Sequence, residues 1–411
     1  MNASHQVAGR EDRAEVQPPG TEVGVLGWLR HNLFSSIPSS IATVVVGVFL
    51  VIGLILLADW VLFSARWGVI TANMRLFLVG QYPPSEIWRV WLLLLVLSVV
   101  MGASAGSWRS GAVRMIAIMV AAGQLAIALL ALVSGLGLVG ALALAASASL
   151  LIVVMALVRR RRLASRVLVL GWLLVALLTL PLLGGFGLAG VISTVGSNVW
   201  GGLLLTLLLA VVSILLSFPL GVALALGRRS TLPVVRLLST AFIEIVRAVP
   251  LVTILFMAAL LFPLFLPQGM RIDNVFRAMG GLTIFSAAYV AENVRGGLQA
   301  IPSGQIEAAN AIGLNAFQRN LYIVLPQALR AVIPANVGLF ISLLKDTTLV
   351  AIAGTGLLEL LGIGRAVVAQ PSWIGAQLEV YVFISAVFFV LCYIMSQASY
   401  RLEEQMGVGH R

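Results

Sequence analysis

The chain has 411 residues, of which 60% are hydrophobic and only 10% are charged, and its mean hydropathy is +1.07. This composition excludes a soluble globular protein, whose outer surface must be mostly polar, and it indicates a polytopic membrane protein. The net charge of +11 does not indicate nucleic-acid binding, since no basic stripe is interleaved with aromatic residues. The single cysteine, Cys392, excludes a disulfide framework and a thiolate metal site within one chain.

The chain begins with a polar segment, residues 1–35, which contains the breaker Pro18-Pro19-Gly20. The first apolar run begins near Ile41 and is long enough to remain in the bilayer, so the pattern is not that of a secretory signal. We expect residues 1–35 to form a polar cytoplasmic tail, with a disordered leader.

Apolar runs of about 20 residues predict ten membrane spans, and short linkers leave eight or nine open. The runs lack the alternation of barrel strands, so the fold class is all-α, a polytopic helical bundle. The predicted spans are residues 41–63, 88–107, 112–133, 136–158, 167–189, 198–226, 234–262, 279–299, 332–353 and 380–399.

Basic residues predict the orientation of these spans. The strongest cluster is Arg159-Arg160-Arg161-Arg162 with Arg166, and such clusters stay on the cytoplasmic side. Both termini are then cytoplasmic, and the segments 64–87, 263–278 and 354–379 face the other side. The rule holds by majority, because a few arginines fall outside: Arg66, Arg75, Arg271 and Arg277.

The character of the spans changes near residue 190. Residues 36–190 are rich in Leu, Ala and Val, whereas residues 191–400 carry charges, Asn, Thr and Pro at membrane depth. We therefore predict an accessory set of transmembrane helices, then a functional core, then a cytoplasmic tail at 401–411. No internal repeat is visible, which disfavours secondary transporters built from inverted halves.

A polar island at 301–326 interrupts the apolar core and reads E-A-A-x3-G-x9-I-x-L-P from Glu307 to Pro326. We expect Ser303 to cap a short helix, Glu307 to lie near its positive end, and Gly313 to permit a turn. A second helix should follow and stop at Pro326. Such a helix fits a groove on a partner protein, while the alternative is an ordinary interfacial helix.

This island resembles the EAA loop of ABC importer permeases, the cytoplasmic element that couples a membrane pore to an ATPase. Three further stretches resemble the polar amino-acid subgroup of type I importers: I-E-I-V-R-A-V-P-L at 243–251, Y-V-A-E-N-V-R-G-G-L-Q-A-I-P-S-G-Q at 289–305, and L-K-D-T-T-L-V at 344–350. The resemblance covers about 195–400. One departure is R-A-V-P at 247–250, where the subgroup has R-G-T-P.

The first half resembles the general L-amino-acid permeases, a branch with extra N-terminal spans. The matching stretches are W-L-R-H-N-L-F at 28–34, and G-Q-Y-P-P at 80–84 before W-R-V-W at 88–91. The resemblance implies a subunit of the bacterial inner membrane that imports L-amino acids, polar or of broad range. Its implied partners are an ATPase dimer, a periplasmic amino-acid-binding protein, and a second permease that is either a paralogue or another copy.

The resemblance also implies which residues couple this chain to its ATPase: Glu307, Ala308, Ala309, Gly313, Leu314 and Pro326. No cofactor is expected on this chain, since ATP and Mg bind the ATPase subunit. The sequence agrees, because it contains no G-x4-G-K-[ST] motif. We also find no nucleophile elbow and no H-E-x-x-H, so we expect a transport subunit and not an enzyme.

Charged residues inside the core predict the substrate pathway independently. An amino acid is a zwitterion and needs both a cation and an anion, and ionisable groups at membrane depth usually face a cavity or a partner. The candidates are Glu244, Arg247, Lys345, Asp346, Thr347 and Thr348. The alternative is an ion-pair network that fixes helix register, and either threonine can bond back to the carbonyl four residues earlier.

Glu292 and Arg295, three residues apart, are predicted to form a structural pair that supports the polar island. Two rival functions remain at this stage. An ion-coupled secondary transporter or channel would use the buried charges without an ATPase, but it leaves the EAA pattern unexplained. An intramembrane enzyme would need a His- or Asp-based constellation that the sequence lacks.

Overall fold

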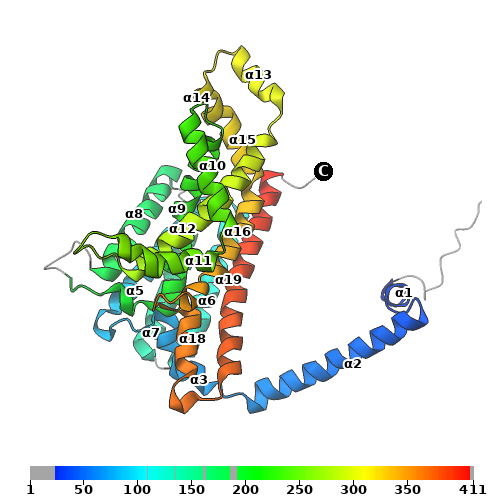
Figure 1. Ribbon diagram of the computed structural model, residues 1–411. Helices are drawn as coiled ribbons and strands as arrows, with labels where there is room; N and C mark the ends of the chain where they lie inside the picture. Colours follow the sequence, from blue (N-terminus) through cyan, green and yellow to red (C-terminus); the bar gives the residue numbers. More distant parts are fainter. Residues whose placement is uncertain (1–23, 109, 135, 161–162, 186–191, 408–411) are drawn as a thin grey trace, which may run out of the picture. The chain divides into compact units, whose positions relative to one another are not determined.

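The computed structural model describes residues 24–108, 110–134, 136–160, 163–185 and 192–407 (Figure 1). The all-α prediction is confirmed, since helices make up nearly all of the regular structure. The chain forms two compact units, Met1–Arg66 and Trp67–Arg411, and each is described by itself.

The first unit consists of a short helix and one long apolar helix. Its elements are α1 (Gly24–Asn32), α2 (Ile37–Asp59) and the π-helical turn η1 (Trp60–Ser64). Ser36 caps α2 by accepting a hydrogen bond from the Ser39 N–H at 3.3 Å. No residue of α2 is buried, as expected of a lipid-facing span. Helix α1 lies within the polar tail predicted for 1–35, and residues 1–23 of that tail are outside the described residues.

The second unit begins with the accessory helices. Two short helices and a 3-10 turn precede four long helices: α3 (Gly68–Ala72), α4 (Met74–Val79), η2 (Pro84–Glu86), α5 (Trp88–Ser107), α6 (Gly111–Leu132), α7 (Gly137–Arg160) and α8 (Ser165–Gly184). Helices α5 and α7 pack closely because Gly102 and Gly106 lie on one face of α5. A Cβ at Gly102 would lie 2.5 Å from the Leu151 carbonyl oxygen, so only glycine permits this approach.

The core helices follow. In chain order they are η3 (Ser197–Val199), α9 (Gly202–Arg228), α10 (Pro233–Ala248), α11 (Leu251–Phe256), the π-turn η4 (Met257–Leu261), η5 (Phe262–Phe265), α12 (Asn274–Gln299), α13 (Ser303–Ala311), α14 (Ala316–Arg319), the π-turn η6 (Asn320–Val324), α15 (Leu325–Ala331), α16 (Ile333–Asp346), α17 (Leu349–Ile352), β1 (Leu358–Glu359), α18 (Leu360–Val368), η7 (Pro371–Trp373) and α19 (Gln377–Met406). Helix α12 packs along α9, where Gly221 meets Val290.

The membrane spans agree approximately with the ten predicted. Eight helices of the described chain are long and apolar enough to cross a bilayer, and the bent pair α10 and α11 makes a ninth. Helix α12 corresponds to the predicted span 279–299 and has 26 residues. Helix α12 is not among these eight helices, because its Arg, Glu and Asn side chains lower its mean hydropathy.

The predicted span 234–262 corresponds to a bent pair of helical segments and not to one continuous helix. The chain bends by 105° between α10 and the segment Leu251–Phe265. Val249 precedes Pro250 and is extended, with φ −105° and ψ 134°. A residue before proline is driven out of the helical region, so the R-A-V-P sequence itself breaks the helix.

The helical hydrogen bonding is interrupted a second time near Pro263, and Arg277 of α12 stabilises this interruption. Pro263 has no N–H for the Ala259 carbonyl, and the Phe262 N–H bonds to Met257 in place of Ala258. The Arg277 guanidinium donates to both freed carbonyls, at 3.3 Å from the Ala258 oxygen. Arg277 therefore replaces the missing helical hydrogen bonds.

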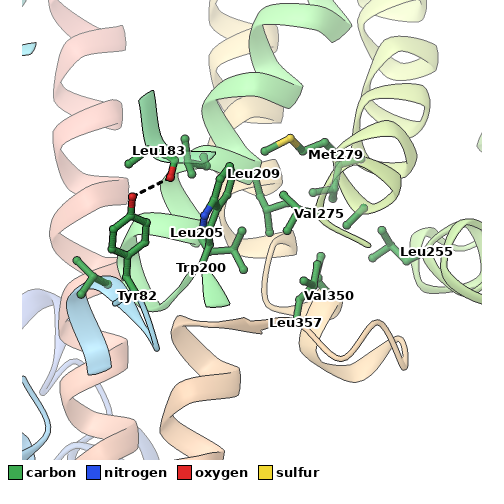
Figure 2. Close-up of a cluster of buried hydrophobic side chains, with 14 of the residues drawn as sticks. Tyr82, Leu183, Trp200, Leu205, Leu209, Leu255, Val275, Met279, Val350 and Leu357 are labelled. Carbon is green, nitrogen blue, oxygen red and sulfur yellow. Dashed lines mark hydrogen bonds between the residues drawn. The ribbon is translucent and has the colours of Figure 1, made fainter. Parts of the chain in front are cut away.

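A buried cluster joins the accessory helices to the core. Figure 2 shows the Tyr82 hydroxyl directed at the Leu183 carbonyl, with Trp200 beside them. Tyr82 donates this hydrogen bond at 2.7 Å, and burial raises its pKa to about 12, so the hydroxyl keeps its proton. Residues of both halves of the second unit pack here, among them Val90, Leu205 and Leu282.

Three chain segments also meet through their backbones. Gly80 pairs with Trp200, and Gly201 and Gly202 pair with Leu358 and Glu359. Gly202 has φ +59°, and a Cβ there would lie 2.4 Å from the Phe77 carbonyl oxygen. The G-Q-Y-P-P stretch therefore begins at a junction where only glycine fits.

Beside this junction, Glu359 caps α18 with its side chain completely buried. Its carboxylate oxygens accept from the Leu361 and Gly362 N–H groups, each at 2.9 Å. The Thr206 hydroxyl donates to the Gly202 carbonyl at 3.0 Å and lies 3.5 Å from the Glu359 carboxylate, to which it can also donate. Burial raises the Glu359 pKa to about 7, and the hydrogen bonds from Leu361, Gly362 and Thr206 oppose this rise.

Candidate functional site

The polar island forms a helix, a turn and a second helix, as predicted. Figure 1 shows α13 and α14 at one end of the second unit, beyond the end of α10. At the end of α13, Gly313 adopts φ +81°, and the Leu314 N–H bonds to the Ala309 carbonyl at 3.1 Å. This is the bonding of a glycine-terminated helix. Arg319 then donates to the Asn310 side chain at 2.7 Å and braces the two helices.

Two expectations about α13 were wrong. Its N-cap is Pro302, which makes no capping hydrogen bond, and Ser303 is the first helical residue. Glu307 therefore lies one turn inside the helix and not at its positive end. The preceding proline fixes the helix start one residue earlier than the sequence suggested. Glu307 is exposed and makes no side-chain hydrogen bond or ion pair within the described chain.

The exposed surface of the island is partly apolar. Ala308 is exposed while Ala309 is buried against the neighbouring turn. Ile312 and Phe317, on either side of Gly313, are 74% and 73% exposed. The sequence pattern does not single out Ile312 or Phe317. The sequence does place large apolar residues on both sides of a polar turn. Such side chains, when exposed in the isolated chain, mark a surface that a partner protein buries.

Pro326 does not stop the second helix, contrary to the prediction. The helix continues through α15, and Pro326 lies in its first turn. A proline in a helix cannot bond to the carbonyl four residues earlier. The π-turn η6 accommodates this, because the Leu325 N–H bonds to Asn320, one residue further back. An open cleft of about 450 Å³ lies beside this turn and is lined by Ile301, Pro326, Gln327, Arg330 and Ala331.

Glu244 and Arg247 take part in a charged network that joins three helices. They do not pair with each other. Arg228 of α9 binds Glu244 of α10 at 2.8 Å and Glu292 of α12 at 3.4 Å. Arg247 reaches Glu292 at 3.5 Å, and its guanidinium lies over the Tyr289 ring.

Glu292 is the centre of this network. It also accepts from the Arg295 Nε at 3.0 Å, which is the pair predicted from their spacing. Arg295 continues to Gln299, at 2.8 Å, just before the polar island. The network thus contains three arginines and two glutamates, and it ties the end of α9 to α10 and α12. These side chains are one-fifth to one-half exposed, so water still reaches them.

The remaining pathway candidates lie together at the end of α16. Lys345 is exposed and Asp346 is half-buried, and neither forms an ion pair within the described chain. Thr347 and Thr348 donate to the carbonyls of Leu344 and Lys345, at 2.7 and 2.8 Å. Both hydroxyls therefore bond back to carbonyls three residues earlier, where four residues had been expected for one of them. Their oxygens remain available as acceptors.

Comparison with known proteins decides the family. Residues 217–406 match the family described as "Binding-protein-dependent transport system inner membrane component". The glutamate/glutamine/aspartate/asparagine transport system permease protein BztC of Rhodobacter capsulatus is 35% identical over 426 residues, covering 96% of each chain. This chain belongs to the family of binding-protein-dependent transport system inner membrane components.

Other members match the core of this permease. The inner membrane amino-acid ABC transporter permease protein YhdY of Escherichia coli is 47% identical over 210 residues, 51% of this chain and 57% of that protein. The probable glutamine ABC transporter permease protein GlnP of Bacillus subtilis is 36% identical over 204 residues, 50% of this chain and 91% of that protein. A solved amino acid ABC transporter with histidines covers 50% of this chain and 92% of its own, with 28% identity and a TM-score of 0.44.

The family match contains every predicted site residue of the permease. The charged network, the polar island and the end of α16 all lie within 217–406. The accessory helices lie before it and are covered by the match to BztC. Within the described chain, no three His, Cys, Asp or Glu side chains are grouped as a metal site requires. The subunit is a multi-pass transport component of the inner membrane, and its relatives are permeases and not enzymes.

Proposed function

We propose that this chain is the permease subunit of an ATP-driven importer that moves amino acids across the inner membrane by alternating access. The observation that carries the proposal is the exposed, braced helix α13, in a chain of this permease family. Within the described residues, Glu307 makes no side-chain hydrogen bond or ion pair, and Ile312 and Phe317 remain exposed. ATP hydrolysis then takes place on a separate ATPase subunit, with its Mg.

The proposed substrates are polar L-amino acids or a broad range of them. The names of the relatives support this class, since they specify glutamate, glutamine, aspartate, asparagine and cystine. The R-A-V-P stretch at 247–250 lacks the threonine hydroxyl of the related R-G-T-P.

Glu307, Ala308, Ala309, Gly313, Leu314 and Pro326 are proposed to couple the permease to the ATPase. Small residues at 308 and 309 let a partner backbone come close, and Ile312 and Phe317 supply apolar contacts. Movement of α13 is passed on through the Arg319–Asn310 hydrogen bond and the turn at Gly313 to α15 and α16. The bond between Gln327 and Gln305, at 3.3 Å, adds a second link.

The substrate pathway is proposed to pass the end of α16. Lys345 and Asp346 offer a cation and an anion, and neither forms an ion pair within the described residues, which suits binding of a zwitterion. Thr347 and Thr348 keep acceptor lone pairs. Glu244 and Arg247 remain candidates for this pathway, and their network position supports a role in helix register as well.

The proposed partners are an ATPase dimer, a periplasmic amino-acid-binding protein, and a second permease, paralogous or identical. Both termini are proposed to be cytoplasmic, as the arginine clusters indicate. This orientation places the polar island on the ATPase side and the segment containing Glu359 on the binding-protein side.

The test is uptake of labelled amino acids into proteoliposomes that contain this chain with candidate ATPase and binding-protein subunits. The expected result is uptake that requires ATP hydrolysis and persists when ion gradients are collapsed. Uptake that is independent of ATP but is lost when the ion gradient is collapsed would overturn the proposal and favour an ion-coupled transporter.

A further inference from the structure

An unneutralised group of arginines lies where the accessory helices end. Arg159 and Arg160 end α7, and Arg166 lies in the first turn of α8. All three side chains are exposed, and none forms an ion pair or side-chain hydrogen bond within the described chain. The sequence supplies no local countercharge, since no acidic residue occurs between Glu86 and Glu244.

Two acidic residues of the described chain, Glu403 and Glu404, belong to α19. Arg401 of that helix donates to the Gly111 carbonyl at the start of α6, so Glu403 and Glu404 lie at the same end of the unit. Glu403 accepts from Ser399 at 2.7 Å, and neither glutamate pairs with the arginines. Within the described residues, no acidic side chain supplies the countercharge for these arginines.

Packing fixes the backbone that carries these arginines. A Cβ at Gly106 of α5 would lie 2.6 Å from the Met155 carbonyl oxygen and 3.2 Å from the Arg159 nitrogen, so α7 meets α5 without space between them. After α7, the Leu163 N–H donates to the Ser107 hydroxyl at 3.1 Å. The two ends of the α7–α8 connection are thus held against the end of α5.

The surface next to the arginines is apolar and exposed. Leu157 on α7 is 64% exposed, and Val167 and Leu170 on α8 are 54% and 65% exposed. Trp108 ends α5 at the same level, and the Trp172 indole of α8 donates to Ser104 at 3.0 Å. Tryptophans and arginines at the end of apolar helices mark the headgroup level of a bilayer. Guanidinium groups beside an apolar surface match a lipid, with its phosphate and its acyl chains.

We propose that Arg159, Arg160 and Arg166 form a binding site for the phosphate headgroup of an anionic phospholipid, with its acyl chains on Leu157, Val167 and Leu170. Guanidinium groups bind phosphate oxygens in a bidentate geometry that a lysine ammonium cannot reproduce. The net charge of the lipid matters for this site. The ammonium group of a zwitterionic lipid offsets the charge of its phosphate, whereas an anionic lipid keeps a net negative charge for the arginines.

The experiment measures lipid binding to the full-length chain purified in a neutral detergent, by mass spectrometry of the intact protein. The probes are phosphatidylglycerol, phosphatidylcholine with the same acyl chains, and glycerophosphoglycerol, which lacks acyl chains. We expect phosphatidylglycerol to bind at least about tenfold more tightly than either other probe. Equal binding of phosphatidylcholine would overturn the proposal, as would equal binding of the acyl-free headgroup.

Variants locate the site. The triple substitution R159Q/R160Q/R166Q should weaken phosphatidylglycerol binding about tenfold. The matched control R236Q/R271Q/R365Q removes three exposed arginines elsewhere and should leave binding unchanged. The variant R159K/R160K/R166K keeps the charge and the fold, and it should bind with an intermediate affinity. A glutamine variant that binds like the wild type, or a control that loses binding equally, would overturn the assignment.

An acidic surface on a protein partner is the competing occupant. In that case R159Q/R160Q/R166Q would lose co-purification with the ATPase subunit while retaining phosphatidylglycerol, and the lipid site would be rejected. The proposal concerns the accessory helices and does not depend on which substrate the permease carries.

Discussion

Arg228 at the end of α9 and Glu244 of α10 form an ion pair with 2.8 Å between the Nη2 and Oε1 atoms. This contact joins two consecutive helices across the turn that separates them. Because Arg228 also reaches Glu292 of α12, the three helices are fixed to one another beside the polar island.

Replacing Glu292 tests the network. Glu292→Gln leaves the guanidinium groups of Arg228, Arg247 and Arg295 without their shared carboxylate, and we expect a loss of about 1–2 kcal/mol in stability. Glu244→Gln removes one half-exposed partner and should cost less than about 1 kcal/mol. Thermal unfolding in detergent measures both. A structural role for Glu244 also predicts an unchanged KM for uptake, and a raised KM would assign Glu244 to the substrate pathway.

The buried Glu359 gives the permease a pH-dependent stability. Its pKa is raised from 4.5 to about 7 in the folded chain, so the folded state binds more protons between these values. The contribution of Glu359 to stability should be greatest below pH 4.5, fall as the pH rises towards 7, and level off above it, by about 3 kcal/mol in all. The thermal unfolding midpoint of Glu359→Gln should lose this dependence. Parallel profiles for the two proteins would contradict the assignment.

Arg277 and Pro263 should be energetically coupled. Arg277→Gln leaves the carbonyls of Ala258 and Ala259 without donors, at a cost of about 1–3 kcal/mol. Pro263→Ala restores an N–H for the Ala259 carbonyl, so Arg277→Gln should cost less in that background. A double-mutant cycle of unfolding free energies measures the difference. Strictly additive effects would mean that Arg277 serves another purpose.

The backbone junction should not tolerate side chains. Gly80→Ala and Gly202→Ala each place a Cβ 2.4 Å from another backbone, at positive φ, and we expect each to cost more than about 3 kcal/mol or to prevent folding. Gly338→Ala in α16 is the matched control, since a Cβ there meets nothing within 4 Å and favours the helix. Size-exclusion profiles and unfolding midpoints compare them. Equal tolerance at all three positions would contradict the close approach.

Much of the fold could be predicted because bilayer physics is strict. Long apolar runs predicted the helices, and the E-A-A-x3-G pattern predicted the helix and turn at the polar island. The failures lie at prolines. The bend at Pro250 follows from the local rule for a residue before proline, which the span prediction did not apply. The continued helix through Pro326 depends on whether neighbouring groups satisfy freed carbonyls, as Arg277 does near Pro263. Local sequence does not carry that information.

The sequence was sufficient to select the residues of the charged network that became candidates, but not to predict which of their side chains contact one another. Glu292 and Arg295 were paired correctly by their spacing. Glu244 and Arg247 have the same spacing and do not pair, because Arg228, far away in sequence, lies closer to Glu244. Helix α18 within the predicted outer segment 354–379 was not foreseen, since nine residues carry too weak a periodic pattern.

Helix α13 is proposed to couple this permease to an ATPase. The most direct measurement is ATP hydrolysis together with amino-acid uptake in proteoliposomes, comparing wild type, Glu307→Lys and the control Glu404→Lys, which changes another exposed glutamate. We expect Glu307→Lys to insert normally but to lose at least about tenfold in uptake. In this variant ATP hydrolysis should no longer depend on substrate. Glu404→Lys should behave as wild type. Wild-type uptake by Glu307→Lys, or uptake without ATP, would contradict the coupling role of α13.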